Sequence, residues 1–185
     1  MATEDSEDKV GKNNASEESP DTFDVIIIGA GAAGVGAAIA LAHAGVEDFL
    51  LVDRDVVGSS FASWPKETRF ITPSFPSNSI GMLDLNSIAI GISPAFSMKV
   101  EHPNGAQYAS HLQDLADYFE LPISENTDVE EIQKLDQMFH ITTSNGMIKA
   151  KNIIWAAGEF QYPRLSGFVG SELCRHTASV TEYSN

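Results

Sequence analysis

The feature that most constrains this chain is a short apolar run that leads directly into a glycine-rich turn. Residues 25–28 form a β-branched run typical of a buried strand, and the sequence Gly-Ala-Gly-Ala-Ala-Gly follows at residues 29–34. Residues 35–44 have an alanine-rich helical pattern that Gly45 ends. A second apolar run of strand length occupies residues 48–53. A strand, a helix and a strand within about thirty residues predict a βαβ unit with a right-handed crossover.

Each glycine of this turn has a physical task in binding a dinucleotide. Gly29 permits the sharp turn out of the strand, Gly31 lets the backbone approach a pyrophosphate, and Gly34 lets the helix pack close to the sheet. Ala32 and Ala33 belong to the same turn, just before the helix, where exposed N–H groups and the positive helix end can hold a diphosphate without a lysine. The plain alternative is a tight strand–helix turn with no ligand.

An acidic residue at the end of the second apolar run favours the dinucleotide interpretation. Asp53 follows the last glycine by 19 residues, a spacing that places a carboxylate at the adenosine ribose hydroxyls. Its charge disfavours a 2′-phosphate. The neighbouring Arg54 is either a partner for such a phosphate or a solvated loop charge. We therefore expect FAD or NAD rather than NADP at this site.

Composition excludes several classes of function. The 26 acidic and 11 basic residues give a net charge of −15, which opposes binding to the phosphate backbone of a nucleic acid. Residues 25–46 carry no formal charge, but eight alanines and five glycines make this stretch too weakly apolar for membrane insertion. The single cysteine, Cys174, allows no internal disulfide and no thiolate metal cluster. We expect a buried, inert thiol in a cytoplasmic protein without a metal site.

The 185 residues suit one sizeable domain. Residues 1–22 carry seven acids, two lysines and few apolar side chains, so we expect a disordered acidic tail before a domain over residues 23–185. Residues 57–98 show no clear periodicity and indicate irregular covering structure.

The second half of the chain has clearer patterns. Residues 111–119 are spaced as an amphipathic helix that Pro122 closes. Residues 128–134, 138–143 and 147–151 predict strands, with a tight hairpin at residues 144–146. Residues 152–158 predict a further buried strand that runs into Gly158. We therefore expect a parallel sheet that starts at Phe23, and an interrupted antiparallel meander over residues 129–151.

Together, several stretches resemble the FAD domain of flavoproteins that have two dinucleotide-binding domains. These flavoproteins include flavin-containing monooxygenases and pyridine nucleotide-disulfide oxidoreductases. The stretches are residues 29–34, 53–54, 58–64, 153–158 and 162–167, and the resemblance covers nearly all of residues 23–183. It implies a Rossmann-like α/β FAD-binding domain with a parallel sheet and an antiparallel β-meander.

The resemblance also implies a place for each part of FAD. The three glycines would hold the pyrophosphate, and Asp53 would bind the adenosine ribose. The turn at residues 58–64, with Ser60 and Trp64, would lie near the ribityl chain and the isoalloxazine ring. Trp64 is equally suited to be a packing anchor.

Later residues complete the implied site. Val129 matches the position at which family members hold adenine with backbone groups. Ala156, Ala157 and Gly158 correspond to the family's Ala-Thr-Gly, where the chain passes close to the cofactor; because Ala157 replaces the threonine, any hydroxyl role is absent. His176 matches a family histidine and is either a catalytic acid–base group or, as is commoner for a lone histidine, structural.

Relatives of this kind carry a second glycine fingerprint for NADPH and a returning strand and helix, whereas this sequence has one fingerprint. We therefore expect a truncated form with weakened flavin affinity and no NADPH-driven turnover on its own. NAD(P)H is expected only for a full-length relative, in which the resemblance implies hydride transfer to the flavin. The expected partners are an unidentified small-molecule substrate and either a second copy or a complementing chain.

Two other classes of function stay open. An NAD-dependent dehydrogenase would have a similar first βαβ unit, although the absence of a Tyr-x-x-x-Lys pair excludes the short-chain class. The chain could also be an inactive nucleotide-binding remnant or a partner-binding module. A visible spectrum of the purified chain identifies bound flavin by its yellow colour. For a colourless protein, thermal stabilisation by NAD distinguishes the dehydrogenase from the remnant.

Overall fold

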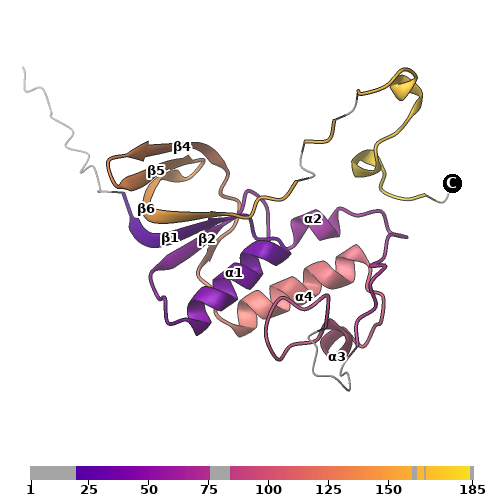
Figure 1. Cartoon of the computed structure of the whole chain (residues 1–185), viewed down its shortest axis with the longest axis horizontal. Helices are drawn as coiled ribbons and strands as arrows, with labels where there is room; N and C mark the ends of the chain where they lie inside the picture. The colour runs from indigo at the N-terminus through magenta and orange to yellow at the C-terminus, as the bar shows by residue number, and fades with distance from the viewer. Residues whose placement is uncertain (1–19, 76–83, 160–161, 165, 184–185) are drawn as a thin grey trace, which may run out of the picture.

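The computed structural model describes residues 20–75, 84–159, 162–164 and 166–183. The described strands form one six-stranded sheet in the order β3-β2-β1-β6-β5-β4. Helices α1 and α4 lie side by side against one face of β1 and β2, and β4, β5 and β6 extend the sheet on the other side of β1 (Figure 1). Most of the predicted acidic tail lies outside the described residues.

The predicted βαβ unit is confirmed. It consists of β1 (Thr22–Ile28), α1 (Ala32–His43) and β2 (Phe49–Val52). The two strands pair in parallel, with Ile27 opposite Leu51. The uncharged stretch at residues 25–46 is divided mainly between strand β1 and helix α1. None of the described helices has the length and hydropathy of a membrane span.

Alternate residues of β1 point to opposite faces of the sheet and so enter two cores. Ile27 packs with Val35 and Ile39 of α1 and with Leu112 of α4. Ile26 and Ile28 face the other way, into a smaller core with residues of β5 and β6. Because the first strand is covered on both sides, its run of β-branched residues has no polar alternation.

The connection from β2 to β3 (Ile123–Ser124) is long and mostly irregular in its described part, as the lack of periodicity predicted. It contains the short helices α2 (Ser59–Ala62) and α3 (Pro94–Met98) and then the long α4 (Gly105–Tyr118). The predicted start of this last helix at residue 111 is wrong, because Asn104 and Gln107 form a capping box that starts α4 at Gly105.

The antiparallel meander is confirmed as β4 (Val129–Leu135), β5 (Met138–Thr143) and β6 (Gly146–Trp155). The predicted separation of residues 147–151 from residues 152–158 is wrong, because β6 is continuous through this point. Its first half pairs antiparallel with β5 and its second half pairs parallel with β1. The polar side chains of Lys151 and Asn152, which lie at this point of β6, both donate hydrogen bonds to Asp24 of β1.

Beyond β6 the chain leaves the sheet and carries two 3₁₀ turns, η1 (Ser171–Leu173) and η2 (Thr177–Ser179). This segment is drawn in yellow in Figure 1 and extends away from the sheet. It touches the loop after α2, where Lys66 N–H donates to the Thr181 carbonyl at 3.1 Å. Cys174 is exposed on this segment, so the prediction of a buried thiol is wrong: no layer of the described structure covers it.

Candidate functional site

The glycine-rich turn lies at the carboxyl end of β1, between the ends of β2 and β6. Gly29 has a φ of +106°, and a Cβ there would lie 2.5 Å from the carbonyl oxygen of Ala156. Its N–H donates to the Val52 carbonyl at 2.8 Å, and Ala156 N–H donates to Ile28 at 2.8 Å. The turn is therefore fixed to both neighbouring strands, and its first position accepts only glycine.

The other two glycines differ sharply in the space around them. A Cβ on Gly34 would lie 1.7 Å from the carbonyl oxygen of Gly29, so helix α1 packs directly on the turn that precedes it. A Cβ on Gly31 would meet only Ser60 Oγ, at 3.9 Å. The fold thus has no steric need for glycine at position 31, and the backbone there is open to a ligand. Ala32 and Ala33 continue this surface at the start of α1.

Asp53, just beyond β2, is hydrogen-bonded directly to the turn. One carboxylate oxygen accepts from Ala30 N–H at 2.6 Å and the other from Asp55 N–H at 2.8 Å. The side chain is half-buried, so these charge-assisted hydrogen bonds hold it in place. Arg54, by contrast, is exposed and pairs with Asp55 at 3.4 Å, a surface contact that contributes little to stability.

The loop of residues 53–58 is also joined to the segment that follows β3. Thr127 N–H donates to the Asp53 carbonyl at 2.7 Å, and Asn126 N–H donates to the Asp55 carbonyl at 2.9 Å. Gly58 N–H closes the loop onto the turn by donating to the Ala30 carbonyl at 3.0 Å. Three segments that are distant in sequence therefore form one hydrogen-bonded edge at the carboxyl ends of the parallel strands, where α/β sheets bind ligands.

Helix α2 brings Ser60 beside Gly31, and it rests closely on α4. Gly58 has a φ of +74°, and a Cβ there would lie 2.9 Å from the Cα of Ala109. A Cβ on Gly105 would lie 2.1 Å from the Phe61 carbonyl oxygen. Glycines on both elements thus allow the backbones to approach.

Trp64 is half-buried in an aromatic cluster. Its ring centroid lies 5.2 Å from that of Phe61 and 5.3 Å from that of Phe70, and the Phe70 ring in turn packs against that of Tyr108 with a centroid distance of 4.5 Å. These contacts favour the interpretation of Trp64 as a packing anchor.

Of the remaining predicted residues, those at 156–158 lie close to the turn and Val129 lies farther away. Ala156 and Ala157 are next to it, since a Cβ on Gly29 would approach the backbone of both. Gly158 follows with a φ of +78°. Val129 begins β4, three strands from β1. The chain two residues before it contacts the site, where Thr127 N–H donates to the Asp53 carbonyl.

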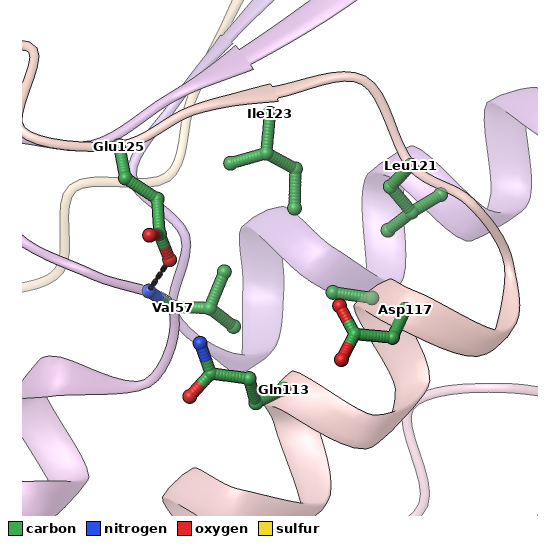
Figure 2. A pocket seen from close by; sticks show the side chains of 7 residues that line it. Val57, Gln113, Asp117, Leu121, Ile123 and Glu125 are labelled. Atoms are coloured by element: carbon green, nitrogen blue, oxygen red, sulfur yellow. Dashed lines mark hydrogen bonds between the residues drawn. The ribbon is translucent and has the colours of Figure 1, made fainter.

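Sequence reasoning missed Glu125, whose carboxylate accepts a hydrogen bond from Val57 N–H at 2.9 Å. Figure 2 shows this contact at the wall of a pocket of about 330 Å³ on the α4 side of the loop. The pocket is lined by Val57, Gln113, Ala116, Asp117, Leu121, Ile123 and Glu125. The only signal for Glu125 was its place in the polar run that follows the two-residue strand β3, and that strand was itself not predicted.

Sequence reasoning also missed a buried histidine on α4. His111 is 2% exposed, its Nδ1 lies 3.1 Å from Ser97 Oγ, and its Nε2 has no hydrogen-bond partner within the described part of the chain. Burial lowers the pKa of the imidazole, although Asp114 and Asp84 partly oppose this effect. Neither His111 nor Ser97 touches the turn. Their contact belongs to the packing of α3 on α4.

Comparison with known proteins gives a consistent result. The family model described as "Pyridine nucleotide-disulphide oxidoreductase" matches residues 26–185. The uncharacterized oxidoreductase CzcO of Bacillus velezensis is 29% identical over 144 residues, which cover 77% of this chain and 38% of that protein.

Two solved structures are similar in fold. The bacillithiol disulfide reductase of Bacillus cereus has a TM-score of 0.65 at 25% identity, over 83% of this chain and 45% of that chain. The flavin-containing monooxygenase of Stenotrophomonas maltophilia has a TM-score of 0.61 at 19% identity, over 80% and 42% of the two chains. This chain therefore spans less than half the length of these relatives. The predicted Rossmann-like α/β fold of FAD-binding type is confirmed.

Proposed function

Because the chain belongs to the pyridine nucleotide-disulphide oxidoreductase family, a family of FAD-dependent oxidoreductases, we propose that residues 23–185 bind FAD. We further propose that they form the FAD-binding portion of an NAD(P)H-dependent, monooxygenase-like flavin oxidoreductase. The observation that carries the proposal is the open backbone at Gly31, which no packing contact explains and which lies beside Asp53 and Ser60.

The turn fits the pyrophosphate of FAD. The N–H groups at the start of α1 have no intrahelical partners, and the helix dipole adds partial positive charge there. A chain with a net charge of −15 gains from binding the diphosphate through backbone rather than through lysines. Gly31, Ala32, Ala33 and Gly34 would form this cradle.

Residues on either side would hold the two ends of the cofactor. Asp53 keeps lone pairs free for the ribose hydroxyls even while it accepts from Ala30 and Asp55. The backbone around Val129 would bind adenine, and Arg54 would remain a solvated charge at the rim. Toward the flavin, Ser60 lies beside Gly31, Trp64 supports α2 from its aromatic cluster, and residues 156–158 pass next to the turn.

When bound, the flavin would supply the redox chemistry, namely acceptance of hydride from NAD(P)H and its transfer to an acceptor. The residues of this chain would bind and orient the cofactor. A single cysteine provides no dithiol, so the substrate would be a small molecule reduced or oxygenated by the flavin itself. The same scarcity of cysteine supports a cytoplasmic location. The NAD(P)H site would lie in another part of the protein, on a second copy or on a complementing chain.

The proposal is tested by titrating the purified chain with FAD, FMN, NAD and NADP. FAD is expected to bind with quenching of its fluorescence and a shift of its visible spectrum. FMN is expected to bind more weakly, because it lacks the adenosine that Asp53 and the segment near Val129 would hold. Binding of NAD without FAD would instead support a dehydrogenase, and binding of none of the four would indicate an inactive remnant or a partner-binding module.

A further inference from the structure

The loop of residues 53–58, at the edge that would hold the dinucleotide, is held in part by the side chain of Glu125 from the segment after β3. Val57 is 4% exposed, and its N–H donates to the Glu125 carboxylate at 2.9 Å. Figure 2 shows the carboxylate reaching from the segment after β3 to the backbone nitrogen of Val57. No other acceptor for this N–H exists in the part of the chain that the structure describes. A buried N–H without an acceptor is costly, so this contact helps to hold the backbone of Val57, whose side chain packs in the hydrophobic core.

The two halves of the loop are held by different groups. Backbone N–H groups of Asn126 and Thr127 bind the carbonyls of Asp55 and Asp53, which fixes the first half. Among the described residues, the second half has one hydrogen bond to the same segment, from Val57 N–H to the side chain of Glu125. A substitution at this position can therefore release one half of the loop while the other stays in place.

Movement of Val57 would be passed directly to the glycine-rich turn. The next residue, Gly58, donates its N–H to the Ala30 carbonyl at 3.0 Å, and the Ala30 N–H binds Asp53 at 2.6 Å. The peptide groups of Ala30 are thus clamped from two sides, and one clamp depends on the position of Val57. Ala30 immediately precedes Gly31, the open position of the proposed cradle.

We infer that Glu125 is a positioning residue, which acts through Val57 and Gly58 to hold the pyrophosphate turn in its binding shape. This inference rests on the proposed function for its ligand, FAD. Its role requires a hydrogen-bond acceptor at the end of a side chain of this length, and it does not require negative charge. The same pocket offers a matched control, because Asp117 is an exposed carboxylate on its wall and makes no contact with the loop.

Four variants distinguish a need for the length of the Glu125 side chain from a need for its negative charge. Glu125→Gln keeps an acceptor oxygen at the same length, and its FAD dissociation constant is expected to stay within about threefold of that of the unmodified chain. Glu125→Asp keeps the charge but is one methylene too short, and Glu125→Ala removes the group. Both are expected to weaken FAD binding by about tenfold or more, because a buried N–H loses its partner. Asp117→Ala removes an equal charge from the same pocket and is expected to bind FAD normally.

Amide hydrogen exchange in the FAD-free protein provides a second readout. The N–H groups of Val57 and Gly58 are expected to exchange faster in Glu125→Asp and Glu125→Ala than in the unmodified chain, Glu125→Gln and Asp117→Ala. Amides of α1 are expected to be unchanged. If the unmodified chain does not bind FAD, the proposed function fails, and the exchange rates alone still decide whether Glu125 holds the loop.

Three results would overturn the inference. The first is FAD binding of normal strength in a folded Glu125→Asp variant. The second is an equal loss of affinity in Glu125→Gln and Glu125→Ala, which would assign the effect to charge. The third is unchanged exchange at Val57 and Gly58 in the shortened variant, which would show that the loop does not depend on this carboxylate.

Discussion

The carboxylate of Asp53 accepts a hydrogen bond of 2.6 Å from the backbone N–H of Ala30. This contact joins the end of β2 to the turn that follows β1, although the two residues are 23 positions apart. We therefore assign two tasks to Asp53. It shapes the turn in the free protein, and it would bind the adenosine ribose once FAD is present.

Replacing Asp53 is expected to weaken FAD binding strongly. Asp53→Ala removes the acceptor for the N–H groups of Ala30 and Asp55 together with the proposed ribose contact, so we expect a loss of about ten- to a hundredfold in affinity. Fluorescence titration measures it. Asp48→Ala is the matched control, because Asp48 carries the same charge near the opposite end of β2 and its carboxylate accepts a hydrogen bond from Asp24 N–H, away from the turn. Equal losses in the two variants would assign the effect to net charge and contradict the account.

Gly34→Ala separates steric fit from helix propensity. Propensity alone predicts that alanine stabilises α1 by about 1 kcal/mol. The structure predicts the opposite sign, because the new Cβ would lie 1.7 Å from the Gly29 carbonyl oxygen. We expect the free energy of unfolding to fall by about 2–4 kcal/mol in urea denaturation. A more stable variant would show that α1 does not pack on the turn as described.

The buried imidazole of His111 is expected to make the protein less stable in mild acid. Burial lowers its pKa below the ordinary value of 6.5, so the unfolded chain takes up a proton before the folded one does. The free energy of unfolding should therefore fall as the pH drops from about 7 toward the lowered pKa. Urea midpoints between about pH 5 and 8 test this, with His111→Leu as the reference that cannot titrate. Parallel pH profiles for the two proteins would refute it.

Tyr108 is expected to have the reverse effect at alkaline pH. Burial, with a contribution from Asp84, raises the pKa of its hydroxyl from 10.0 to about 12, and the hydroxyl donates to the Asn86 carbonyl at 2.7 Å. The unfolded chain loses this proton first, so stability should fall as the pH rises from about 10 to about 12. Tyr108→Phe should be less stable at neutral pH by about 1–3 kcal/mol, because the Asn86 carbonyl loses its donor. The gap between the two proteins should then narrow above pH 10, and a constant gap would contradict this prediction.

Sequence patterns correctly predicted the parts of the fold that depend on residues close together in the chain. The glycine-rich turn, the parallel pair β1 and β2, and the hairpin before Gly146 all depend on residues that are close in sequence. The continuity of β6 depends instead on Asp24, which binds Lys151 and Asn152 from another strand. Two polar residues in a row suggest a strand end when this partner is not visible.

The site shows the same division. Asp53 was predicted from its spacing to the turn, whereas Glu125 was not predicted, because its partner lies 68 residues away and β3 is only two residues long. The packing of Trp64 in an aromatic cluster likewise depends on Phe70 and Tyr108, which no motif connects to it.

The most direct test of the account is FAD titration of the unmodified chain beside Gly31→Ala. Gly31 has a φ of −79°, which alanine adopts freely, and the nearest atom to a new Cβ is 3.9 Å away, so the variant should fold with an unchanged unfolding midpoint. The added methyl group would occupy the space of the pyrophosphate. We predict that the unmodified chain binds FAD and that the variant binds it at least about tenfold more weakly, equal to about 1.4 kcal/mol. Equal FAD binding by a folded Gly31→Ala variant would contradict the proposed site.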